Sequence, residues 1–133
     1  MPSLLEISQK FIGKPYKLGK CDCLTMIIDY LRLFGLDIPN SESFNGVNLK
    51  NYADLYRRNS GTIECAADWL ATKCKEVKPH ESLPGDILFL EENNKKFFGI
   101  DGGNGKIIAP VVGDSVETLR SDNCKRLRVF RYG

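Results

Sequence analysis

Cys23 stands where a helix is expected to begin, which is a position that makes cysteine thiols reactive. It follows Asp22 directly, and the apolar residues after it recur at the spacing of one helix face: Leu24, Ile27, Ile28, Leu31 and Phe34. Unpaired backbone N–H groups and the helix dipole stabilise a thiolate at a helix N-terminus, so Cys23 is a candidate nucleophile. The alternative is that Cys23 is a small buried residue with no chemical role.

A cysteine nucleophile needs a base, and the chain has one histidine, His80. This histidine lies in the polar segment 78–82, where we expect an exposed loop residue. Asp22 and Asp101 are the other conceivable bases, but an unperturbed aspartate is a poor base for a thiol. The sequence alone therefore gives Cys23 no evident proton acceptor.

The other cysteines predict neither a disulfide framework nor a metal site. The chain has five, which are irregularly spaced: Cys21, Cys23, Cys65, Cys74 and Cys124. Cys21 and Cys23 are too close to pair without heavy strain. The Cys-x-Cys spacing is not that of a usual zinc site, and the histidine stands far along the chain. We expect reduced thiols, with no metal and no other cofactor.

The elements that must position Cys23 change in type along the chain. Helical spacing predicts helices over 4–11, 24–34, 49–56 and 63–70, with Asn48 capping the third and a loop over 37–46. Short apolar or alternating runs predict strands over 86–90, 97–101, 106–111 and 126–132. This order predicts one α+β domain over residues 1–133, with N-terminal helices packed on a C-terminal antiparallel β-sheet.

A glycine-rich segment and an arginine-rich segment each have an ordinary structural interpretation. Residues 102–105 precede a strand-type run, so we expect a hairpin turn and not a phosphate loop. The basic run 125–131 alternates at period two, which favours a solvated strand face over a nucleic-acid patch.

Charge and hydropathy exclude several classes of partner. A net charge of +2 is too small to argue for nucleic acid or an anionic membrane. No apolar stretch approaches the roughly 20 residues of a membrane span. The first residues lack the basic and apolar regions of a signal peptide, so we expect synthesis in the cytoplasm without signal-directed export.

Two sequence blocks resemble the NlpC-type cell-wall cysteine peptidases of the papain-like superfamily. Residues 13–19 (GKPYKLG), then Asp22-Cys23 and a helix up to Gly35 and Pro39, are similar to the family pattern G-x-P-Y-x-x-G, D-C-S-G, helix, G-x-x-x-P. Residues 83–89 (LPGDILF) and 97–109 (FFGIDGGNGKIIA) resemble the family's L-x-P-G-D-L-V-F-F and H-V-G-I-Y-L-G-N-G-K-M-I-H. The resemblance implies a papain-like NlpC-type fold with Cys23 at the nucleophile position.

The departures from the family pattern fall on the catalytic positions. Phe97 occupies the position of the family's base histidine, and Ala109 occupies that of the polar residue that orients it. Phenylalanine cannot accept a proton and alanine cannot hold an imidazole, so the nucleophile–base–orienter arrangement is absent. The resemblance therefore implies a catalytically degenerate domain.

The resemblance leaves three functional interpretations. The short insert before Asp22 and the ending at 127–129 are similar to a phage-encoded branch, which implies a phage tail or tail-tip component in the virion. A second interpretation is an active amidase or endopeptidase on cell-wall peptides, with an unrecognised base such as His80. A third is a module that binds peptidoglycan or a partner protein without cutting it. Tyr52, Tyr56 and Trp69 could line a glycan groove, but their helical spacing favours the core.

The strand pattern gives a geometric expectation for the degenerate site. Phe97, Gly99 and Asp101 should share one face of their strand, and Phe98 and Ile100 the other. In the family the face of position 97 looks toward the cysteine helix. We therefore expect the Phe97 ring beside Cys23, with His80 far from the thiol.

The helix start predicts an order of reactivity among the thiols. The helix N-terminus should hold the pKa of Cys23 below those of Cys65 and Cys74, although an apolar neighbour would oppose this effect. Limited iodoacetamide labelling of the native protein near neutral pH, read by mass spectrometry, should modify Cys23 first. If Cys23 reacts only after denaturation, it is a packed core residue.

Overall fold

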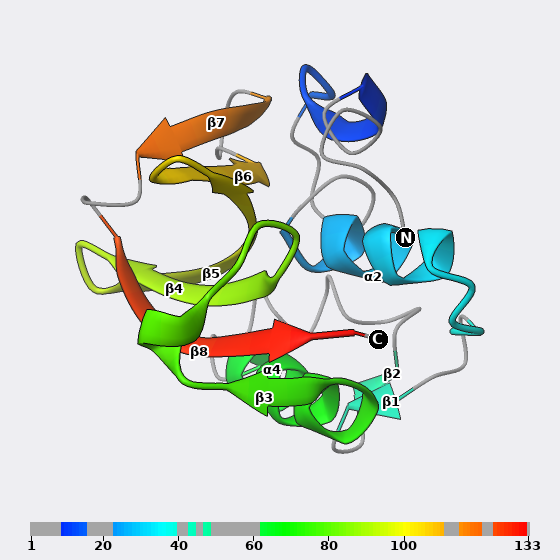
Figure 1. Ribbon diagram of the computed structural model, residues 1–133. Helices are drawn as coiled ribbons and strands as arrows, with labels where there is room; N and C mark the ends of the chain where they lie inside the picture. Colours follow the sequence, from blue (N-terminus) through cyan, green and yellow to red (C-terminus); the bar gives the residue numbers. More distant parts are fainter. Residues whose placement is uncertain are drawn as a thin grey trace.

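The structure of the 133-residue chain is a computed structural model (Figure 1). It describes residues 9–15, 23–39, 43–44, 47–48, 62–110, 115–120 and 124–132. Asp22, Tyr52, Tyr56 and the helix expected over 49–56 lie outside the described residues, as does most of the helix expected over 4–11, of which residues 9–11 are helical.

Helices α2 (Cys23–Leu33) and α4 (Thr62–Lys73) precede the sheet. Shortly after the end of α2, Gly35 has a φ of +90°, and the N–H groups of Gly35 and Leu36 donate to the carbonyls of Arg32 and Leu31. A left-handed residue at this position is the usual way in which the last carbonyls of a helix are satisfied. A short 3-10 turn, η2 (Pro79–Glu81), leads toward the central strands.

The sheet has six strands in the order β3-β8-β4-β5-β6-β7, and every neighbouring pair is antiparallel. Their bounds are β3 (Lys75–Val77), β4 (Ile87–Glu92), β5 (Lys95–Gly103), β6 (Lys106–Pro110), β7 (Val116–Arg120) and β8 (Lys125–Arg131). Strands β4 to β7 follow one another as a meander, and β8 returns to lie between β3 and β4. A separate pair is formed by β1 (Ser43–Phe44) and β2 (Val47–Asn48).

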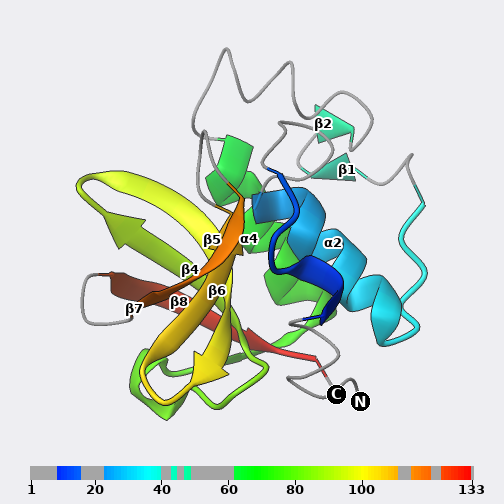
Figure 2. The ribbon, with the colours of Figure 1, turned by 90° about the horizontal axis from the view of Figure 1, so that it is seen from above.

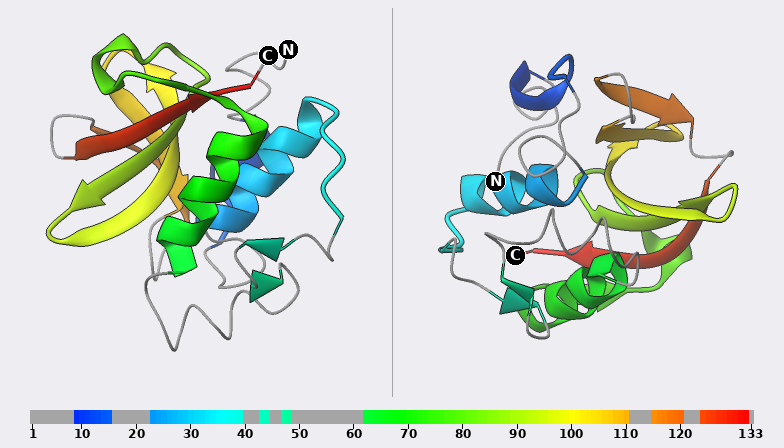
Figure 3. Two further views of the ribbon diagram at one scale, coloured as in Figure 1. Left: turned by 90° about the horizontal axis from the view of Figure 1, so that it is seen from below. Right: turned by 180° about the vertical axis from the view of Figure 1, so that it is seen from behind.

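Both helices lie on the same side of the curved sheet, as Figures 2 and 3 show. Helix α2 packs against β5 and β6, whereas α4 packs against β8 and β3. The main core joins the helices to the strand residues that face them, among them Phe89, Phe98, Ile100 and Phe130. No helix of the described residues is both long and apolar enough to cross a membrane.

A second apolar cluster is formed by strand residues on the sheet's other face. Its buried members are Leu88, Leu90, Ile107, Ala109 and Val129, and the partly buried Val77, Phe97, Leu119 and Cys124 pack against it. Gly99 permits this cluster to close, since a Cβ there would lie 2.7 Å from Ile107 Cγ2 and 3.2 Å from Leu90 Cδ1. Side chains that alternate along β4 and β5 therefore supply two separate apolar layers.

The α+β class with an antiparallel sheet is confirmed, as are the helices expected over 24–34 and 63–70. The hairpin turn is also confirmed, because Asn104 and Gly105 both have positive φ, as a two-residue hairpin connection requires. Trp69 is buried in the main core, as its helical spacing favours.

Three expectations about secondary structure are wrong. Strands β3 and β7 were not expected, because both are short and rich in charged residues. The loop expected over 37–46 contains β1, and Asn48, expected as a helix cap, lies in β2.

The basic run 125–131 is a strand, but it is not a solvated face. Its arginines form ion pairs on both sides of the sheet. Strand β8 lies inside the sheet, and its register against β4 shifts between Phe89 and Leu90. This irregularity puts Arg126 and Arg128 beside consecutive residues of β4, and so on opposite faces.

Candidate functional site

Cys23 is the first residue of α2, as the sequence predicts, although its side chain lies outside the described part of the structure. The helix is fixed at this end by the burial of Leu24 and Ile27, both of which belong to the main core. The backbone position is therefore one that favours a thiolate. Asp22, the neighbouring candidate, lies outside the described residues.

Phe97 and Ala109, the residues compared with the family's base and orienter, have apolar side chains and apolar neighbours. Phe97 lies in β5 and Ala109 in β6. Ala109 is fully buried in the second cluster, and the half-buried Phe97 packs against that cluster. Their assignment as the positions of the missing histidine and its orienter stays a prediction.

The expected orientation of β5 is wrong for the side chains that the structure describes. Phe98 and Ile100 belong to the core that contains α2, whereas Phe97 packs with the second cluster on the opposite face. Both faces of β5 carry a phenylalanine, so alternation separates Phe97 from Phe98 but does not tell which of the two meets the helix. The expected contact between Phe97 and the Cys23 side chain itself falls outside the described residues.

His80 is an exposed residue, as the sequence predicts. It lies in η2, its side chain is 77% exposed, and its Nε2 atom is 3.9 Å from Glu81 Oε1. No other hydrogen bond or ion pair involves it within the described part of the chain.

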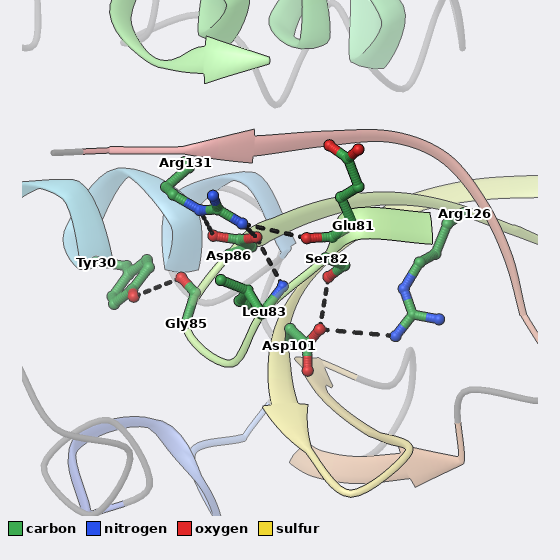
Figure 4. Close-up of polar contacts among 9 residues, drawn as sticks. All are labelled: Tyr30, Glu81, Ser82, Leu83, Gly85, Asp86, Asp101, Arg126 and Arg131. Carbon is green, nitrogen blue, oxygen red and sulfur yellow. Dashed lines mark hydrogen bonds and ion pairs between the residues drawn. The ribbon is translucent and has the colours of Figure 1, made fainter. Parts of the chain in front are cut away.

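The most highly organised polar group is the carboxylate of Asp86, which is only 3% exposed (Figure 4). Arg131 binds it with two hydrogen bonds, from Nε to Oδ1 at 2.9 Å and from Nη2 to Oδ2 at 2.8 Å. The N–H of Leu83 also donates to Oδ2, at 2.9 Å. This bidentate pair connects the turn before β4 to the end of β8.

The same turn is connected to α2. The hydroxyl of Tyr30 donates to the carbonyl of Gly85 at 2.7 Å, and burial together with the charge of Asp86 raises the pKa of Tyr30 well above its ordinary value. Gly85 has a φ of +94°, which favours glycine at this point of the turn. The turn is therefore a junction of the helix and two strands.

Asp101, considered above as an unusual base, is also buried and engaged. Its Oδ2 atom accepts a hydrogen bond from the Ser82 hydroxyl at 2.5 Å, and its Oδ1 accepts one from the N–H of Gly103 at 2.9 Å. Arg126 Nη2 lies 3.7 Å from Oδ2 (Figure 4). These contacts orient Asp101 within the sheet and its neighbouring turn.

Sequence reasoning gave Asp86 and Arg131 no role, and it missed the bond between Ser82 and Asp101. One local pattern could have indicated the first pair. An aspartate directly after Pro-Gly, at the start of a buried strand, can accept from the turn's own N–H groups. Its distant partner, Arg131, depends on strand pairing that the sequence does not display.

The three cysteines whose side chains the structure describes, Cys65, Cys74 and Cys124, lie in separate places. Burial raises the pKa of the Cys74 thiol to about 11. Cys124 donates to Glu92 Oε2 at 3.3 Å, and Cys65 lies on α4 beside a hollow of about 420 Å³ that Asp68, Trp69 and Thr72 also line. Within the described ranges no three His, Cys, Asp or Glu side chains gather as a metal site would require.

Comparisons with known proteins give likenesses among solved structures alone. No protein-family model matches the chain, and no curated protein does. Among solved structures, the chain is similar to RipD from Mycobacterium tuberculosis, which is described as a non-catalytic NlpC/p60 domain protein with an adaptation to peptidoglycan-binding function. The two are 16% identical, the TM-score is 0.44, and the alignment covers 96% of this chain and 93% of RipD.

Because the Asp86–Arg131 pair is buried, we expect substitution of Asp86 to lower the free energy of unfolding more than substitution of an exposed, paired aspartate. Asp86→Asn replaces one carboxylate oxygen with an amide donor that faces other donors, so we expect a loss of about 1–3 kcal/mol in the free energy of unfolding. The matched control is Asp68→Asn, because Asp68 is 78% exposed and also pairs with an arginine of β8, Arg128. That exposed pair should contribute about 0–1 kcal/mol.

Urea unfolding followed by circular dichroism measures both variants. Equal losses for the two substitutions would contradict the role given to the buried carboxylate.

Proposed function

We propose that this chain is a catalytically degenerate NlpC-type domain that binds cell-wall peptidoglycan without cleaving it. One observation carries the proposal: the residues of β5 and β6 that share the core with α2 are Phe98, Ile100 and Ile108, while Phe97 and Ala109, compared with the family's base and orienter, lie in the other apolar cluster. None of these side chains can accept a proton. General-base assistance typically contributes about 10²–10⁴-fold to such reactions, and a site without a base lacks that contribution.

The scaffold supports a binding role because buried hydrogen bonds fix its elements to one another. The turn at Asp86 is fastened to β8 and to α2 by buried hydrogen bonds. A domain held this firmly can present a fixed surface to a ligand while performing no chemistry.

We further propose a phage tail or tail tip as the assembly that carries this domain. Two sequence features support that context, namely the short insert before Asp22 and the Leu-Arg-Val run at residues 127–129. In a tail tip, a domain that holds peptidoglycan would keep the particle at the cell wall.

An active cysteine amidase or endopeptidase is the second candidate, and a single observation favours it. Cys23 begins α2, where the helix N-terminus favours the nucleophilic thiolate. Retention on peptidoglycan and release of amino groups from it, measured together, separate the two candidates.

We expect the purified chain to sediment with insoluble peptidoglycan and to release no new amino groups from it. The reason is that binding needs only the folded surface, whereas cleavage needs a proton acceptor for the thiol. The matched control is Cys23→Ala, which should be retained to the same extent. Release of amino groups that depends on Cys23 would show an active hydrolase, and His80→Ala would then test the base. Absence of retention for both proteins would contradict peptidoglycan binding and favour a purely structural role.

A further inference from the structure

We draw no further inference here: the strongest candidate, the hollow of about 420 Å³ on α4 that Cys65, Asp68, Trp69 and Thr72 line, carries none, because nothing in the described part of the structure shows what covers or fills it.

Discussion

The buried carboxylate of Asp86 is the interaction on which the described structure depends. Three hydrogen bonds from Arg131 and from the backbone of Leu83 hold it, and the adjacent Gly85 accepts one from Tyr30 of α2. Through this turn the first strand of the meander, the last strand of the chain and the cysteine helix are fixed to one another. A buried charge is tolerable here because its acceptor positions are filled by donors in good geometry.

The position of the turn determines how β4 and β5 divide the apolar residues between two faces. Ile87, Phe89, Phe98 and Ile100 face the helices, while Leu88, Leu90 and Phe97 form the other layer. Because side chains alternate, no residue of these strands can serve both layers. The position compared with the family's base histidine belongs to the layer that faces away from α2, and this explains why an aromatic ring is accommodated there.

Much of the architecture could be predicted from residue patterns because those patterns are local. The amphipathic run after Cys23 predicts α2, and Asn104-Gly105 predicts the tight hairpin between β5 and β6. Strands β3 and β7 could not be predicted, because they are short and rich in charged residues. Their extended conformation depends on pairing with β8 and β6 and not on their own composition.

The candidate site was less predictable for a related reason. Sequence alternation correctly separates Phe97 from Phe98, but both faces of that strand are apolar, and the choice between them depends on packing against α2. The ion pairs of Arg126, Arg128 and Arg131 likewise depend on the register of β8 and its irregularity at Phe89/Leu90. Partners separated by 25 to 60 residues cannot be found from local spacing.

Phe97 faces the second apolar cluster and not the cysteine helix. Nuclear Overhauser effects from the Phe97 ring protons, in protein with labelled methyl groups, test this orientation. We expect strong effects to the methyl groups of Leu90, its partner across β4 and β5, and none to Leu24 at the start of α2. Strong effects from the Phe97 ring to Leu24 or to the Cys23 β-protons would contradict it.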